Sequence, residues 1–436
     1  MIRKDTITEP THTIPVVARS DVLIVGGGPA GVSAAINAAR HGASTCLIEQ
    51  SGALGGMATT GLMSHWTGAT KGGFYEEILD KSIDCFKEDG KVLGTWQTIN
   101  TEKLKKVFFD MALETGVRLR LHTLACAPVM EGDMITGVVA ESKSGREAFM
   151  ARIVVDATGD GDIAARAGVP FCAGREVDGQ MQPATLMFKV GGVDIARAVF
   201  PGSFESNLAI PAGLIQDLGK QHLAPPAGHV LLYPSTLPGV VTVNMTNCPG
   251  IDGTKTEDLT HAEIECTAQI GPIVSFLQKF VPGFETCYHL TSATTVGIRE
   301  TRHFDGEYTL TGEDILAAKV FDDWVVPNVH FNFDIHHLAG AGLDPTGMQK
   351  TFPQHKPYTI PYRCLVPKNI DNLLLAGRNI SGTHVAHSSF RVMPICVNTG
   401  QAAGIAAALC VKHGVSPRRL DHRLLQAILK ELGVFP

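Results

Sequence analysis

Residues 21–49 read DVLIVGGGPAGVSAAINAARHGASTCLIE and decide how this 436-residue chain folds. The apolar run from Val22 to Val25 predicts a strand, which leads directly into three glycines. Small residues then predict a helix to about Arg40. A second predicted strand, Thr45 to Ile48, ends in the acid Glu49. Strand, helix and strand in this order, with glycines at the first turn, are typical of a βαβ unit that binds a dinucleotide.

The small residues at the turn each have a physical role in that prediction. Gly26 allows the tight turn, Gly28 leaves room for a pyrophosphate, and Gly31 lets the helix lie close to the sheet. Phosphate would bind at the helix N-terminus, where unpaired N–H groups and the helix dipole favour negative charge. Glu49 would accept both hydroxyls of the adenosine ribose. The predicted cofactor contacts of this unit are Gly26, Gly28, Pro29, Ala30, Gly31 and Glu49.

The composition is that of a large soluble α/β enzyme. With 44% hydrophobic and 18% charged residues, the chain can bury a core that suits two or three domains. Its net charge of −6 offers no basic face for nucleic acid. No apolar run approaches the roughly 18–20 residues of a membrane span, and the polar start is not a secretory signal, so a cytoplasmic protein is expected. The ten scattered cysteines predict neither disulfides nor a zinc or iron–sulfur site.

A second stretch of small residues follows the ribose acid and indicates which dinucleotide is bound. After Gln50 comes a loop that contains Gly55-Gly56-Met57-Ala58. A glycine pair here lets backbone pass beside the ribityl chain and isoalloxazine of a flavin, although a plain flexible loop would have the same composition. The loop adds Gln50, Gly55, Gly56, Met57 and Ala58 to the predicted cofactor contacts.

Two later segments predict the rest of the cofactor site. Residues 152–162, RIVVDATGDGD, predict a strand that ends in Ala157-Thr158-Gly159-Asp160. Asn372 to Ala376 predict another buried strand, which is followed by Gly377-Arg378 and by a helix-like run from Asn398 to Val411. The positive end of that helix would stabilise charge on a reduced flavin. The predicted contacts here are Ala157, Thr158, Gly159, Asp160, Gly377, Arg378, Asn398, Thr399, Gly400 and Ala402.

On these motifs the chain resembles the family of FAD-dependent oxidoreductases, which are flavoproteins with two dinucleotide-binding motifs. The resemblance rests on Gly-Gly-Met-Ala at 55–58, Arg-Glu-Thr-Arg at 299–302 and Gly-Glu-Tyr-Thr-Leu-Thr at 306–311. It also rests on segment 375–394, which contains Leu-Ala-Gly-Arg, His-x-x-His and Arg-Val-Met-Pro. A more distant similarity is to the flavoproteins of fumarate reductase and succinate dehydrogenase. The resemblance covers nearly the whole chain from about Asp21 and implies FAD as the cofactor.

The implied fold class is α/β. A Rossmann-like FAD-binding domain, with a mostly parallel sheet and helices, is interrupted by an inserted α+β substrate or cap domain. Strands such as His229 to Tyr233 and helix-like stretches such as Ala262 to Phe280 mark the insertion. The predicted divisions are an N-terminal arm at 1–20, the first part of the FAD-binding domain at 21–170, the cap at 171–360 and the second part of the FAD-binding domain at 361–436.

One position departs from the pattern of such flavoproteins. Many of them have Gly-Asp after the last strand, where the acid binds a ribityl hydroxyl, whereas this chain has Gly377-Arg378. The ribityl contact is then expected from Asp160 or from backbone. Arg378 would face phosphate or flavin, or would form a surface ion pair.

Candidate catalytic residues come from two clusters. In the distant relatives a loop near the flavin presents a histidine and then an arginine that holds a substrate carboxylate, a role that Arg391 suits by bidentate pairing. His384 or His387 would relay a proton, unless they only make structural hydrogen bonds. In the second cluster Arg299 and Arg302 could bind an anionic substrate, or Arg299 and Glu300 could form a buried interdomain ion pair; for Glu300 the structural role is favoured. The predicted catalytic residues are His384, His387, Arg391, Arg299 and Arg302.

Three other histidines are weaker candidates. His336 and His337 follow a predicted strand, so their side chains point to opposite sides and at most one faces the site; no metal site is expected from them. His65 follows the second glycine stretch, where some relatives attach FAD covalently. The match to that position is poor, and non-covalent FAD is expected.

The expected function is hydride transfer between flavin N5 and a small anionic substrate, a carboxylate. Two alternatives stay open. A reductase or hydroxylase would use NAD(P)H or O₂, although the sequence holds no second Gly-x-Gly-x-x-Gly unit for a nicotinamide domain. A non-redox protein would hold flavin only for structure. The sequence does not identify the electron partner, and a homodimer would suit such a chain although no residue indicates one.

Overall fold

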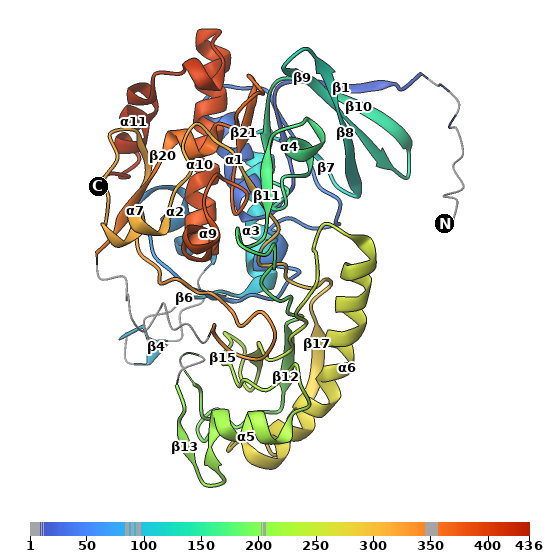
Figure 1. Ribbon diagram of the computed structural model, residues 1–436, viewed down its shortest axis with the longest axis vertical. Helices are drawn as coiled ribbons and strands as arrows, with labels where there is room; N and C mark the ends of the chain where they lie inside the picture. Colours follow the sequence, from blue (N-terminus) through green and yellow to red (C-terminus); the bar gives the residue numbers. More distant parts are fainter. Residues whose placement is uncertain are drawn as a thin grey trace.

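The computed structural model of the protein describes residues 9, 11, 13–82, 87–88, 91–92, 97–201, 203, 206–344 and 356–436. A seven-stranded sheet with its helices forms the upper part of the view in Figure 1, and a smaller antiparallel sheet with the long helix α6 lies below it. The seven-stranded sheet is called the main sheet and the smaller one the cap sheet. The predicted α/β class, a parallel sheet with helices, is confirmed.

The main sheet joins a parallel half to an antiparallel half through one long strand. The first residues of β10 pair antiparallel with β9, whereas its last residues pair parallel with both β1 and β21. The βαβ unit is as predicted, because β2 pairs parallel with β1 and helix α1 connects them. In sheet order the strands are β7 (Arg118–Arg120), β2 (Thr45–Ile48), β1 (Val16–Val25), β10 (Gly145–Asp156), β9 (Met134–Ser142) and β8 (Thr123–Glu131), with β21 (Leu373–Leu375) beside β10.

Two helices of small residues form the centre of the molecule. Helix α1 (Pro29–Arg40) and helix α10 (Met393–His413) lie against each other, and a Cβ at Gly400 would meet the Ala30 carbonyl oxygen at 2.1 Å. By length and composition α10 could cross a membrane, which the sequence analysis did not anticipate. Its most apolar window is 94% buried inside the protein, as in the core helix of a soluble fold.

Shorter helices and ribbons surround this centre. The helices are α2 (Gly73–Ser82), α3 (Thr101–Glu114), α4 (Asp162–Arg166), α7 (Gly312–Leu316), α9 (His384–Phe390) and α11 (His422–Glu431), with 3₁₀ turns at Gly56–Ala58, Tyr362–Leu365 and Pro417–Arg419. The two-stranded ribbons are β3 (His65–Trp66) with β6 (Gln97–Thr98), β4 (Lys87–Glu88) with β5 (Lys91–Val92), β11 (Phe171–Ala173) with β18 (Arg302–Phe304), and β19 (Trp324–Val329) with β20 (Tyr358–Pro361).

The cap has a hydrophobic core of its own. Its buried apolar residues lie between Ala184 and Val296, with Leu62 joining them from the main body. Buried residues from Phe304 onward pack instead with the main sheet, which favours an insertion that ends near residue 300. The divisions at 20, 170 and 360 stay predictions. The cap contains β12 (Phe188–Gly191), β13 (Ala209–Ile210), β14 (Gly213–Leu214), β15 (Leu232–Pro234), β16 (Val241–Val243), β17 (Tyr288–Ser292), α5 (Ile215–His222) and α6 (Thr256–Phe280).

Candidate active site

The glycine turn, Gly26–Gly31, is closed on one side and open on the other. A Cβ at Gly31 would lie 1.9 Å from the Gly26 carbonyl oxygen, and a Cβ at Gly26, whose φ is +98°, would lie 2.5 Å from the Ala157 carbonyl oxygen. These two glycines are required by the close approach of backbone. A Cβ at Gly28 would meet no atom within 4 Å, although Ala30 to Ala38 of the following helix α1 are buried. The open side of the turn is therefore the place where a ligand can approach the N-terminus of α1.

The predicted ribose acid is held beside this turn. The Glu49 carboxylate accepts hydrogen bonds from the Gly27 amide at 2.6 Å and from the Ser51 amide at 2.7 Å. These bonds fix an acceptor-only group at the end of β2, where it is partly exposed. Gln50 is exposed next to it. The geometry agrees with the role that the sequence predicts for Glu49.

The second glycine stretch packs directly on the first. The Gly55 amide donates to the Gly27 carbonyl oxygen at 2.7 Å, and a Cβ at Gly56 would lie 3.3 Å from the Gly28 Cα. Met57 continues toward the cap, because a Cβ at Gly297 would lie 2.8 Å from its terminal methyl group. The loop thus runs from the glycine turn to the junction with the cap, the course that a flavin nucleotide would follow.

The end of β10 lies beside the glycine turn and carries a residue that the sequence analysis missed. Asp156 is fully buried, which raises the pKa of its carboxyl, and it accepts hydrogen bonds from the Thr158, Ile163 and Ala164 amides. It thereby shapes the turn that carries Ala157 to Asp160. The Ala157 amide donates to the Val25 carbonyl oxygen, which places that turn beside the glycine turn. An acid at the end of a buried strand was the available signal.

Arg378 forms an ion pair that is not at the surface. Its guanidinium lies 2.6 Å from the Asp160 carboxylate, with side-chain exposures of 17% and 20%. Asp160 also accepts the Thr301 hydroxyl, and its carbonyl oxygen accepts a hydrogen bond from Arg302. Of the two alternatives for Arg378, an ion pair is therefore formed, but Thr301 and Arg302 cover it and it is not at the open surface. Contacts of Asp160 and Arg378 with the cofactor stay predictions.

Helix α10 begins earlier than predicted. It starts at Met393 because Pro394 occupies its first turn, where a missing N–H costs nothing. The sequence analysis placed Asn398, Thr399, Gly400 and Ala402 at the positive end of the helix. In the structure these four residues lie inside the helix. Thr399 accepts the Gly377 amide, so the helix holds the loop after β21 in place. Arg391 and Val392 are the residues that precede the helix N-terminus.

Four ionisable side chains meet in a group here named the Glu300 cluster: Glu300, His303, His384 and His387. One carboxylate oxygen, Oε1 of Glu300, lies 2.8 Å from His303 Nε2 and 2.5 Å from His384 Nδ1. Burial raises the pKa of Glu300, but the bonds to both histidines outweigh it and hold the pKa well below its usual range. Because a carboxylate only accepts, both imidazoles must donate to it. This assignment leaves His384 Nε2 able to accept a proton.

His387 lies beside this carboxylate without a bond to it. Its ring meets the His303 ring edge to face at 4.9 Å, and burial lowers the pKa of His387 well below its ordinary value. Nδ1 of His387 and Nδ1 of His303 are buried without a hydrogen-bond partner among the described residues. The predicted buried ion pair of Arg299 and Glu300 is wrong in its partners. Glu300 is buried but bonds to two imidazoles, whereas Arg299 donates to the Pro183 carbonyl oxygen.

A second group, here named the arginine cluster, contains Arg299, Arg391, Asp334 and His336. Arg391 donates to the Asp334 carboxylate at 2.8 Å, and His336 lies 3.4 Å from the same carboxylate. Burial raises the pKa of Asp334, but His336 and Arg391 hold it well below its usual range. Burial and the charge of Arg391 lower the pKa of Arg299 to about 10, and its guanidinium donates to the Pro183 carbonyl oxygen. Two partly buried cations thus lie near one carboxylate.

The three histidines that the sequence analysis gave as weaker candidates, and two residues that it missed, are placed as follows. His336 is buried in the arginine cluster and His337 is partly exposed, so one of the two faces the site, as predicted. His65 stacks on the Tyr233 ring at 4.2 Å, and burial lowers the pKa of His65 to about 4. Gln182 and His229 were missed by the sequence analysis. Gln182 donates its amide to Glu300 and accepts the His336 amide, so it connects the two clusters.

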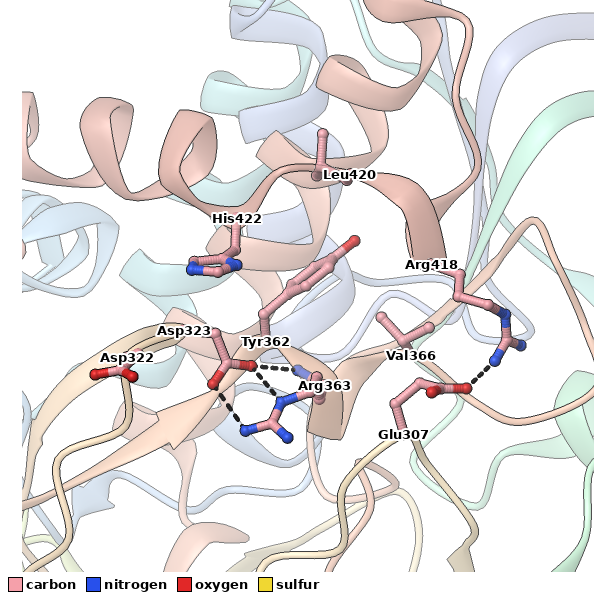
Figure 2. A pocket seen from close by; sticks show the side chains of 9 residues that line it. All are labelled: Glu307, Asp322, Asp323, Tyr362, Arg363, Val366, Arg418, Leu420 and His422. Carbon is pink, nitrogen blue, oxygen red and sulfur yellow. Dashed lines mark hydrogen bonds and ion pairs between the residues drawn. The ribbon is translucent and has the colours of Figure 1, made fainter.

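A cavity of about 350 Å³ lies elsewhere and is not part of this site (Figure 2). Its guanidinium groups point to carboxylates, Arg363 to Asp323 and Arg418 to Glu307. With its cations already paired and no glycine turn among its residues, it offers no cradle for a dinucleotide. The lining residues are Glu307, Asp322, Asp323, Tyr362, Arg363, Val366, Arg418, Leu420 and His422.

Comparison with known proteins identifies the family of the chain. A family model described as FAD dependent oxidoreductase matches residues 21–429. The soluble pyridine nucleotide transhydrogenase of Chromohalobacter salexigens is 50% identical over 46 residues, which are 11% of this chain and 9% of that protein. A geranylgeranyl bacteriochlorophyll reductase-like protein from Thermoplasma acidophilum is similar in structure, with a TM-score of 0.50, 13% identity, and 95% of this chain and 84% of that chain covered. The structural similarity concerns the fold alone.

Proposed function

Because the chain belongs to the FAD-dependent oxidoreductase family and uses FAD as its cofactor, we propose that it oxidises or reduces a small carboxylate by hydride exchange with the flavin N5. The residues fit the cofactor: Glu49 would hold the ribose, and the open face at Gly28 would receive the pyrophosphate at the N-terminus of α1. The backbone at Gly55 and Gly56 would lie beside the flavin.

The charge balance of the arginine cluster carries the proposal of an anionic substrate. Arg391 is 12% exposed and Arg299 is partly buried, and Asp334 supplies one negative charge between them. Nε of Arg391 is buried without a hydrogen-bond partner among the described residues. A buried, incompletely paired guanidinium is costly, and a carboxylate is the group that it binds best. A substrate carboxylate would supply both the missing charge and the missing acceptor.

His384 would exchange the proton that accompanies the hydride. Glu300 accepts a hydrogen bond from His384 Nδ1. This bond fixes the ring and leaves Nε2 as the reactive nitrogen. Glu300 acts through His384 and is a positioning residue in this scheme. The cap, with Tyr233 and His229 near the arginine cluster, would exclude water from the substrate.

The test is anaerobic reduction of the bound flavin by a panel of small carboxylates and their amides. At least one carboxylate should bleach the flavin band while its amide does not. Arg391→Met should raise the concentration for half-bleaching by roughly 100-fold, about 2–3 kcal/mol for a lost charged hydrogen bond, with flavin content unchanged. The control is Arg363→Met, because Arg363 pairs with Asp323 and with no residue of either cluster among its described contacts.

Two outcomes would overturn the proposal. Bleaching by NADH or NADPH with no dependence on a carboxylate would favour a nicotinamide-dependent reductase or hydroxylase. A bound flavin that no donor reduces, and that an unsaturated carboxylate does not reoxidise once it has been reduced chemically, would favour a non-redox role.

A further inference from the structure

The Glu300 cluster combines residues that coordinate metal ions. Glu300, His303 and His387 each offer one ligand atom within 4.8 Å of the other two, and all three side chains are buried. Two of them come from the segment before and in β18, and the third comes from α9, 84 residues beyond His303. No spacing in the sequence could indicate such a set, which is why the sequence analysis expected no metal site.

A buried nitrogen in this group needs a partner. His387 is 1% exposed and its Nδ1 has no hydrogen-bond partner among the described residues. Nearby rings do not satisfy it, because the ring of His387 meets those of His303 and Phe390 edge to face. An imidazole buried in this way loses its hydration without recovering a bond.

The carboxylate at the centre also lacks a compensating cation within hydrogen-bond distance. Glu300 is 0% exposed, and its described partners are the imidazoles of His303 and His384 and the Gln182 amide. The arginines nearby have carboxylates or carbonyls of their own, Asp160 for Arg378 and Asp334 for Arg391. A divalent ion would neutralise Glu300 and bind one nitrogen of each of His303 and His387 at once.

We propose that Glu300, His303 and His387 bind one divalent transition-metal ion, Zn²⁺ or Fe²⁺. Two imidazoles and one carboxylate are a ligand set that both ions accept, whereas Mg²⁺ prefers oxygen ligands. The ion takes the place of the proton between His303 Nε2 and Glu300 Oε1. These two atoms lie 2.8 Å apart, so they need to separate only slightly to bind one ion with bonds of about 2.1 Å. His384 keeps its bond to Glu300 as an outer partner that orients the carboxylate.

This site goes beyond the proposed function and does not depend on it, since its readout is bound metal and not turnover. The FAD-loaded protein, without an affinity tag, is first treated with a chelator. Separate samples then receive Zn²⁺, Fe²⁺ under anaerobic conditions, or Mg²⁺, and each is desalted before elemental analysis. We expect about one Zn²⁺ or Fe²⁺ per chain and no Mg²⁺. Thermal unfolding should shift upward with Zn²⁺, because the ion binds only the folded state.

The decisive variant is His387→Leu. Removal of a buried imidazole whose Nδ1 makes no hydrogen bond should leave the metal-free protein at least as stable as the parent, while metal uptake and the thermal shift fall at least tenfold. His303→Asn should lose the ion as well. The matched control is His65→Phe, which keeps the ring stack on Tyr233 and should retain the ion.

Two results would contradict the metal site. Absence of Zn²⁺ and Fe²⁺ uptake by the folded, flavin-containing parent would overturn the site. Equal uptake by His387→Leu would show an adventitious ion only, whether or not the flavin turns over.

Discussion

The glycine turn and the cap junction meet ligands in different ways. At the glycine turn the chain offers backbone, one carboxylate and the open side of Gly28. At the cap junction it offers buried charged and imidazole side chains, in the Glu300 cluster and the arginine cluster. A substitution at the turn changes the space available, whereas a substitution at the junction changes the charge balance. The two regions should therefore fail in measurably different ways.

The largest effect is expected at Gly31. In Gly31→Ala the new Cβ would lie 1.9 Å from the Gly26 carbonyl oxygen, and backbone of the turn must move to relieve the overlap. We expect a loss of more than about 3 kcal/mol in the free energy of unfolding and no flavin-bound protein. Soluble yield, flavin-to-protein absorbance ratio and thermal unfolding measure this. A variant that purifies with parental flavin content would contradict the geometry of the turn.

The next effect belongs to the arginine cluster. Asp334→Asn would leave Arg299 and Arg391 partly buried without a carboxylate, which should cost about 3–5 kcal/mol in urea unfolding. Acetate should restore more stability to the variant than to the parent, because it can replace the lost charge. The control Asp323→Asn should cost roughly 1 kcal/mol, since its partner Arg363 is 49% exposed and can reach water. Equal costs at the two positions would mean that the partly buried cations need no anion.

Acid should weaken the cap junction through its neutral histidines. Burial lowers the pKa of His65 and of His336 to about 4 and that of His229 to about 3. A histidine with a depressed folded-state pKa binds fewer protons folded than unfolded, so its contribution is complete above about pH 6.5 and is lost as pH falls toward 4. Between about pH 7.5 and 5 each should cost roughly 2 kcal/mol.

His65→Phe isolates one of these contributions. The variant keeps the stack on Tyr233 but cannot take up a proton, so its stability should fall less between those pH values, by about 2 kcal/mol. Urea unfolding of parent and variant at both pH values measures the difference. Parallel pH profiles would show that His65 titrates normally in the folded protein.

The local part of this fold could be predicted from the sequence, because its signals lie within a few residues. Helix α1 ends at Arg40 and β2 spans Thr45–Ile48, as the periodicity and the glycines predict. The start of α10 was misplaced because the run of small residues stood out more than Pro394, whose fixed φ marks the first turn.

The candidate site could be predicted only in part, because its contacts join distant segments. Arg391 and His384 were found through resemblance, but Asp334 as the partner of Arg391 and Glu300 as the partner of His384 lie 57 and 84 residues away. Gln182, which connects the clusters, stands in a segment with no motif. Charge pairing across such distances is set by the packing of the cap on the main body, and no local pattern encodes it.

The smallest effect on stability is expected at Gly28, where a new side chain would enter the space of the ligand and not that of the protein. In Gly28→Ala the new Cβ meets no protein atom within 4 Å, and Gly28 has φ −68°, so the apoprotein should change in stability by less than about 0.5 kcal/mol. FAD affinity, measured by fluorescence titration of apoprotein, should fall about 10- to 100-fold, or about 1.4–2.8 kcal/mol, because the methyl group occupies the place of the pyrophosphate. Gly271→Ala is the control, because that Cβ also meets no atom within 4 Å but lies in α6. Unchanged affinity in Gly28→Ala would show that the pyrophosphate binds away from this turn, and Glu49 would be the contact to test next.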